Sequence, residues 1–199
     1  MKTLDLFVVE LEKPVQDEIV LNNGAKLYVD SKFNEFEWRV TEGPVVCAPV
    51  RHNTGVEAGD TLFFHHLVVM NEGQVLTGHD NQYLVRFNPE HTINNQAIAY
   101  RNKDGEINTL AGWTLIEPIF EEKEEFPSDL IEMVKLEETP TTKGVVAFDA
   151  PFLEEGGVSV GDTVVFRDKM QYKIKIDDKE YYRVRVQDLL YVEEEVYND

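Results

Sequence analysis

Histidines are the residue type in this chain that is best suited to metal chemistry. All five lie in its first half: His52, His65, His66, His79 and His91. Imidazole is a common metal ligand, so two or three of these side chains could converge on an ion. Their spacing matches no zinc motif, and adjacent residues on a strand, such as His65 and His66, face opposite ways. We therefore expect surface and edge histidines and no metal site.

Two aspartates are the second set of candidate functional residues, since a pair of carboxylates can perform acid and base catalysis. Asp60 and Asp162 each follow a glycine and precede an apolar strand. Glycine accepts the positive φ of a tight turn, and aspartate bonds its own backbone there. The matching context favours a turn role for both aspartates over a catalytic one, so we expect neither an enzyme nor a cofactor.

The segments around these two aspartates are copies of each other. Val56–Phe64 and Val158–Phe166 share a valine, a Gly-Asp turn and an apolar strand ending in phenylalanine. Strands rich in β-branched and aromatic residues flank both segments. In the first half we expect strands at residues 6–11, 43–46, 61–64, 83–87 and 98–100. Their counterparts in the second half are residues 113–119, 144–148, 163–166, 182–186 and 189–192.

A series of short strands that occurs twice predicts an all-β protein made of two tandem small β-barrels. The Asp-Gly turn within Asn102–Gly105 marks the expected joint, so the predicted domains are residues 1–104 and 105–199. No long helix is expected, and only residues 129–138 have a pattern that fits a turn or two of helix.

Each copy also contains a long stretch outside the strand series, at residues 14–42 and 120–143. Long loops in compact domains are commonly functional or disordered. Both stretches carry apolar residues within polar surroundings, which is typical of a docking peptide that orders on a partner. The candidate binding residues are Ile19, Val20, Leu21, Leu27, Val29, Leu130, Ile131, Met133 and Val134.

The ordered series resembles the chaperonin-10 family, the co-chaperonin lids of the GroES type. The similarity is carried by the segments Gly24–Lys32, Thr139–Val146, Val158–Phe166, Lys173–Tyr181 and Val186–Val192. The resemblance implies GroES-like barrels whose mobile loops bind a GroEL-type chaperonin. It further implies a homo-oligomeric ring that caps the folding cavity, with ATP hydrolysed by the chaperonin.

The chain departs from the usual family pattern in two respects. It carries two copies, as the double-length co-chaperonins of plastids do. Only residues 48–55 and 149–157 stand where the family has its roof hairpin, a reduction that resembles some phage-encoded co-chaperonins. Zinc-dependent alcohol dehydrogenases share a GroES-like domain, but the chain lacks their Gly-x-Gly-x-x-Gly motif and cysteine ligands.

Composition limits the partners further. With 38 acidic and 19 basic residues the formal net charge is -19, which disfavours nucleic acid and anionic membranes. No apolar run approaches the roughly 20 residues of a membrane span, and no signal peptide is apparent. Cys47 is the single cysteine, expected as a small buried hydrophobe, and a reducing cytoplasm fits. A duplicated-barrel structural protein, such as a virion component, remains the alternative hypothesis.

Overall fold

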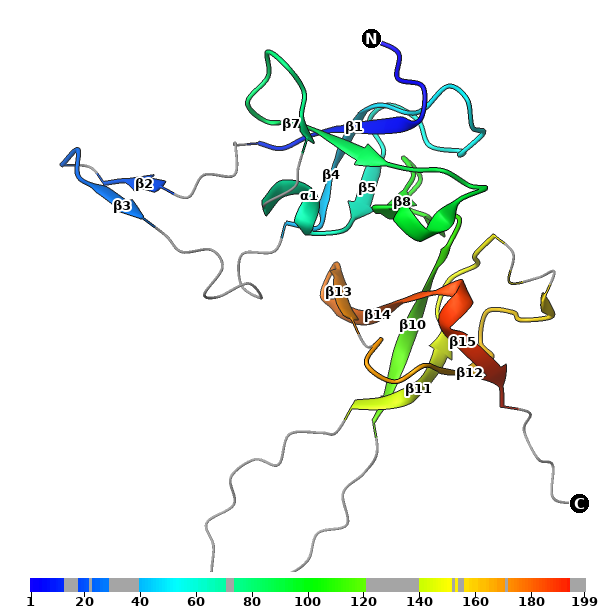
Figure 1. The fold of residues 1–199 in the computed structure, drawn as a ribbon. Helices are drawn as coiled ribbons and strands as arrows, with labels where there is room; N and C mark the ends of the chain where they lie inside the picture. Colours follow the sequence, from blue (N-terminus) through cyan, green and yellow to red (C-terminus); the bar gives the residue numbers. More distant parts are fainter. Residues whose placement is uncertain are drawn as a thin grey trace, which may run out of the picture. The chain divides into compact units, whose positions relative to one another are not determined.

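The computed structural model describes residues 1–12, 18–21, 23–28, 40–70, 74–120, 140–151, 153, 156–170 and 172–193. Within these ranges the regular secondary structure is mostly antiparallel β-strand, with one short α-helix and two single-turn 3-10 helices (Figure 1). The expectation of an all-β protein is confirmed. The weak helical pattern at residues 129–138 lies outside the described residues.

Two compact units divide the chain, Met1–Ala111 and Gly112–Asp199. The elements of the first unit are β1 (Leu6–Glu10), β2 (Glu18–Val20), β3 (Lys26–Tyr28), β4 (Glu42–Cys47), β5 (Thr61–Phe64), α1 (Leu67–Met70), β6 (Gln74–Val75), β7 (Gln82–Arg86), η1 (Thr92–Asn94), β8 (Ala97–Arg101) and β9 (Ile107–Thr109). Those of the second are β10 (Trp113–Phe120), β11 (Pro140–Val146), β12 (Thr163–Phe166), β13 (Tyr172–Ile176), β14 (Lys179–Arg185), η3 (Val186–Asp188) and β15 (Leu189–Val192).

The two units have the same strand order. The first sheet runs β6-β7-β1-β4-β5-β8-β9, and the second runs β13-β14-β10-β11-β12-β15. Six strands therefore correspond one to one, and β9 is an addition at one edge of the first sheet. Because chain order and spatial order both match, the sequence repeat corresponds to a repeat of topology.

The Gly-Asp turn is the same in both units down to its hydrogen bonds. In the first, Gly59 N–H donates to the Val45 carbonyl and Val45 N–H donates to the Asp60 carbonyl, each at 2.8 Å. The Asp60 carboxylate also accepts the Glu57 N–H at 2.7 Å. In the second unit, the Asp162 carboxylate accepts the Ser159 N–H at 2.8 Å. Both aspartates therefore shape turns, as their sequence context predicts.

Each unit has a core formed by one face of its sheet. In the first unit, Phe7, Leu62 and Phe64 belong to this core and are completely buried, and the residues between them on the opposite face, Val8 and Phe63, are completely buried as well. In the second, Phe166 and Tyr182 pack edge to face with ring centroids 5.9 Å apart. Burying one such side chain contributes about 1.5–3 kcal/mol, so these faces supply much of the stability of each unit.

Two expectations about the domains differ from the structure. The turn at Asn102–Gly105 does not join the units: it connects β8 to β9, which pair through Ala99↔Thr109 and Arg101↔Ile107, and the division follows Ala111. Among the described strands, no ladder joins the two edges of either sheet, so neither sheet forms a closed barrel there.

Replacing the two turn aspartates should destabilise the units unequally. Asp60 is 3% exposed and its bond with the Glu57 N–H is partly shielded from water, so Asp60→Ala should lower the free energy of unfolding by about 1–3 kcal/mol. Asp162 is only partly buried, and water can replace its carboxylate, so Asp162→Ala should cost less. Urea denaturation of the full chain measures both, and a larger loss for Asp162→Ala would contradict this account.

Gly144 of β11 should tolerate alanine much less well than its counterpart Gly43 of β4. A Cβ on Gly144 would collide with the Ile116 side chain and the Glu117 carbonyl, whereas one on Gly43 would approach the movable Leu11 Cδ2 to 3.1 Å. Such overpacking typically costs about 1–3 kcal/mol, so we expect a loss of this size for Gly144→Ala and a smaller one for Gly43→Ala. Equal shifts in thermal unfolding would show that β10 and β11 are not this close.

Candidate functional site

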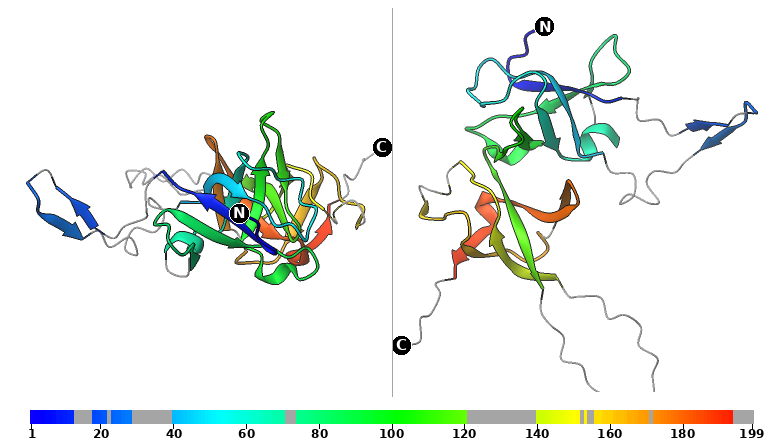
Figure 2. Two further views of the ribbon diagram at one scale, coloured as in Figure 1. Left: turned by 90° about the horizontal axis from the view of Figure 1, so that it is seen from above. Right: turned by 180° about the vertical axis from the view of Figure 1, so that it is seen from behind.

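The two long segments connect equivalent strands in the two units. In the first unit the chain leaves β1 and returns in β4, which pair through Val9↔Val45. In the second it leaves β10 and returns in β11, which pair through Phe120↔Pro140. Figure 2 shows β10 and β11 side by side up to the point where the intervening chain begins. Both candidate binding segments therefore span the same connection of the repeated topology.

The first segment contains a β-hairpin that the sequence reasoning missed. Strands β2 and β3 pair through Ile19↔Leu27 and Val20↔Lys26, and among the described strands they pair only with each other. Leu21 N–H donates to the Ala25 carbonyl at 2.8 Å. Gly24 has a φ of +81°, which an L-residue adopts only with strain. The dipeptide Asn23–Gly24 between short apolar runs is the signal that predicts such a hairpin.

Four of the nine candidate binding residues lie within the ranges that the structure describes. Ile19 and Val20 lie in β2, Leu27 lies in β3, and Leu21 follows β2 with 45% of its surface exposed. The remaining candidates lie outside the described residues: Val29, Leu130, Ile131, Met133 and Val134.

Both segments are shorter than expected from the sequence. Glu42, predicted as the end of the first loop, is the first residue of β4. In the second segment, Phe120 belongs to β10 and residues 140–143 belong to β11. The described strands thus extend into the predicted loops, because their ladders continue beyond the apolar residues that mark them in the sequence.

Polar contacts fix the base of the second segment. The Thr141 hydroxyl donates to the Ile119 carbonyl, across the irregular register between Pro118 and Phe120. On the neighbouring strand, Lys179 Nζ lies 2.7 Å from Glu117 Oε2, and this hydrogen bond raises the pKa of Lys179. The first contact joins β11 to β10 and the second joins β14 to β10, close to the point where the second segment leaves the sheet.

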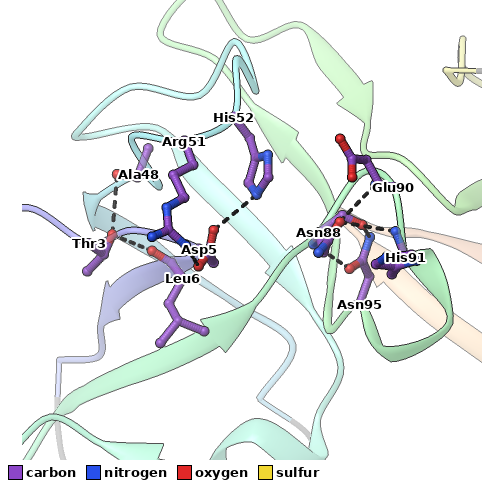
Figure 3. Close-up of polar contacts among 10 residues, drawn as sticks. All are labelled: Thr3, Asp5, Leu6, Ala48, Arg51, His52, Asn88, Glu90, His91 and Asn95. Carbon is purple, nitrogen blue, oxygen red and sulfur yellow. Dashed lines mark hydrogen bonds and ion pairs between the residues drawn. The ribbon is translucent and has the colours of Figure 1, made fainter.

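His52 takes part in a polar cluster near the start of the chain (Figure 3). Asp5 pairs with Arg51 at 2.8 Å and with His52 Nε2 at 3.3 Å, and the His52 ring packs edge to face on Phe87 with centroids 6.1 Å apart. The cluster ties the segment after β4 to the residue before β1. It combines one carboxylate with one imidazole and one guanidinium, which is a structural arrangement rather than a metal site.

The prediction that His65 and His66 face opposite ways is wrong. Their rings stack with centroids 4.6 Å apart and planes at 22°. The reason is that β5 ends at Phe64, so the strand alternation no longer applies when the chain turns toward α1. No group of three or more histidine, cysteine or acidic residues in the described ranges could hold a metal ion.

Cys47 is partly exposed, not buried as its apolar surroundings predict. It is the last residue of β4, and its Sγ lies 3.6 Å from the Thr3 hydroxyl and 3.6 Å from the Met1 carbonyl. The alternation that buries Val45 therefore does not extend to the end of the strand.

A side-chain hydrogen bond stabilises the turn before β8. Asn95 Oδ1 accepts the Asn88 N–H at 2.7 Å (Figure 3).

No model of a known protein family matches the sequence, and no curated protein shows significant similarity to it. The structure adds one observation about membranes: within the described ranges, no helix is long and apolar enough to cross one. The features of the molecule that bear on its function are therefore the repeated topology and the two segments between equivalent strands.

The hairpin in the first segment should weaken without affecting the core when Gly24 is replaced by alanine. A left-handed φ costs an L-residue about 1–2 kcal/mol, so Gly24→Ala should speed amide exchange at Leu21 by about 5–30-fold. Asn tolerates this conformation, so Gly24→Asn is the matched control and should change exchange less. Global unfolding should be unchanged in both variants, and a lower global stability of Gly24→Ala would show that β2 and β3 support the core.

Proposed function

We propose that the chain is a co-chaperonin of the GroES type, in which both units are GroES-like domains. The observation that carries this proposal is the placement of the two apolar-containing segments. They span the same connection in two units of identical strand order. A repeated scaffold that presents a long segment at one equivalent place per unit suits a protein whose contacts with its partner are themselves repeated.

The proposed partner is a GroEL-type chaperonin, and the binding residues are the apolar side chains of the two segments. Ordering a flexible residue costs about 1–2 kcal/mol, so a single segment binds weakly. Several segments acting together raise the avidity by about 10²–10⁴ without new contacts. Weak individual contacts with high combined avidity allow a lid both to close and to leave.

Charge and assembly complete the proposal. A formal net charge of -19 gives the lid a surface that repels other acidic proteins, which discourages adhesion of a folding client. Copies of the chain form a homo-oligomeric ring in the cytoplasm. The chain needs no cofactor and is not an enzyme, because ATP hydrolysis belongs to the chaperonin.

The competing function is a structural one, in which the duplicated domains assemble without a chaperonin, for example in a virion. That function requires the sheets and their edges but gives the two segments no partner. Limited proteolysis separates the two functions. Protection of residues 14–42 and 120–143 by a chaperonin with nucleotide favours the lid, and resistance of these residues in the isolated chain favours the structural protein.

Serine substitutions in the segments should abolish chaperonin binding and leave the fold intact. The double variant Ile131→Ser with Met133→Ser removes two apolar candidates from the second segment, and Ile19→Ser with Leu27→Ser removes an opposed pair from β2 and β3. We expect an immobilised GroEL-type chaperonin with nucleotide to capture the wild-type chain at least tenfold better than the first double variant. The second tests whether the first segment also binds.

A matched control keeps the number of removed apolar side chains constant. Val75 and Ile93 are 45% and 60% exposed and lie outside both segments, so Val75→Ser with Ile93→Ser should be captured like the wild type. Circular dichroism establishes that each variant is folded. Unchanged capture of both segment variants would overturn the binding residues, and failure of the wild-type chain to bind would overturn the function.

A further inference from the structure

The tip of the β2–β3 hairpin holds an asparagine side chain against the peptide that follows it. Asn23 Oδ1 accepts the Ala25 N–H at 3.0 Å, as short polar side chains do in turns. The hydrogen-bonded ring closed in this way includes the Gly24 nitrogen, which lies between the two residues in the chain. All three residues are exposed, and a Cβ on Gly24 would meet nothing within 4 Å. The asparagine carboxamide and the glycine nitrogen therefore share one small ring that water can reach.

A nitrogen in this position can attack the side-chain carbonyl carbon, because glycine leaves it unhindered. The Gly24 nitrogen gives its proton to a solvent base and forms a bond to Asn23 Cγ. The Cγ–Nδ2 bond then breaks, and Nδ2 leaves as ammonia after taking up a proton. Negative charge develops on Oδ1 in this step, and the Ala25 N–H that donates there stabilises it. Water opens the resulting succinimide to aspartate or isoaspartate, so the reaction consumes one water and no oxidant.

One hydrogen bond opposes this reaction while the hairpin is closed. Gly24 N–H donates to the Leu21 carbonyl at 2.8 Å, and the nitrogen cannot attack until that bond opens. Among the described strands, β2 and β3 pair only with each other. A two-stranded hairpin by itself is marginally stable in water. The Gly24 N–H can therefore become free by local opening, while the sheet that contains β1 and β4 stays folded.

The same turn occurs in the β8–β9 hairpin, where the surroundings differ. Gly105 N–H donates to the Asn102 carbonyl and Asn102 N–H donates to the Glu106 carbonyl, each at 3.0 Å, and Gly105 has a φ of +87°. The residue before this glycine is Asp104. Asn102 Oδ1 accepts the Glu106 N–H at 2.9 Å, and that donor is the equivalent of the Ala25 N–H. Because β8 also pairs with β5 inside the large sheet, this turn should open less often.

We propose that Asn23 is a self-modification site, at which the folded chain converts an asparagine to aspartate and isoaspartate as it ages. Opening of the hydrogen bond between Leu21 and Gly24 sets the rate, and the contact with Ala25 holds the carboxamide in place. The sequence contains no other asparagine followed by glycine. The reaction needs neither a partner nor a catalyst beyond water.

The modification changes the first segment and leaves the second as it is. It places a carboxylate at the hairpin tip, and the isoaspartate product also adds one carbon to the main chain. The turn that joins Leu21 to Gly24 and Ala25 is then lost. Residues 120–143 contain neither asparagine nor glycine. In a consequence that rests on the proposed function, an aged chain would contact the chaperonin mainly through its second segment.

Peptide mapping by mass spectrometry during incubation of the folded full chain tests the site. The variant Asp104→Asn puts the same asparagine–glycine dipeptide into the matching turn of the β8–β9 hairpin, so one molecule reports on both positions. We expect the amide at position 23 to be lost at least tenfold faster than the amide at position 104. Electron-transfer fragmentation distinguishes isoaspartate from aspartate, and digestion in heavy-oxygen water marks any conversion that occurs during preparation.

Asp60→Ala supplies the control for unfolding, because it should destabilise the first unit at a turn outside the hairpin. Loss of the amide at position 23 should proceed at the same rate in this variant, since only the hairpin has to open. Faster loss would show that the reaction requires unfolding of the whole unit.

Two results would overturn the modification site. One is an Asn23 that keeps its amide throughout the incubation, and the other is equal loss at positions 23 and 104 of the Asp104→Asn variant. Neither measurement involves a chaperonin, so failure here leaves the proposed function standing. Failure of the wild-type chain to be captured by a chaperonin likewise leaves the chemistry of Asn23 unaffected.

Discussion

The hydrogen bonds between each Gly-Asp turn and the neighbouring strand determine the organisation of both units. Gly59 and Asp60 exchange bonds with Val45, and Gly161 and Asp162 do the same with Val146. These bonds fix where β5 starts beside β4 and where β12 starts beside β11. The strands that follow then take the same order in both sheets, and the two long segments necessarily leave from equivalent connections.

A scaffold fixed in this way separates stability from binding. The buried side chains of the sheets support each unit, and the two aspartates of the Gly-Asp turns, Asp60 and Asp162, shape those turns. The two segments, between β1 and β4 and between β10 and β11, are the surfaces left for the proposed partner. Their apolar residues account for the proposed contact with a chaperonin.

The sequence predicts the repeat and most strands because buried strands need β-branched and aromatic residues, and turns need Gly and Asp. It misses β9, since Ile107–Thr109 is short and only half buried, and this displaces the expected joint. The hairpin of β2 and β3 is missed because each strand has only three residues, although Asn23–Gly24 is a signal for it. The stacking of His65 on His66 depends on where β5 ends, which residue types alone do not specify. The undescribed candidates in the second segment stay predictions.

The most direct test of the central claim is a hydrogen-exchange comparison of the full chain alone and with a GroEL-type chaperonin and nucleotide. If the duplicated scaffold serves to present the two segments, the chaperonin should slow exchange in peptides that cover residues 14–42 and 120–143. Exchange in β5 and β12 should be unchanged. Protection confined to the sheets, or no protection at any peptide, would contradict the account.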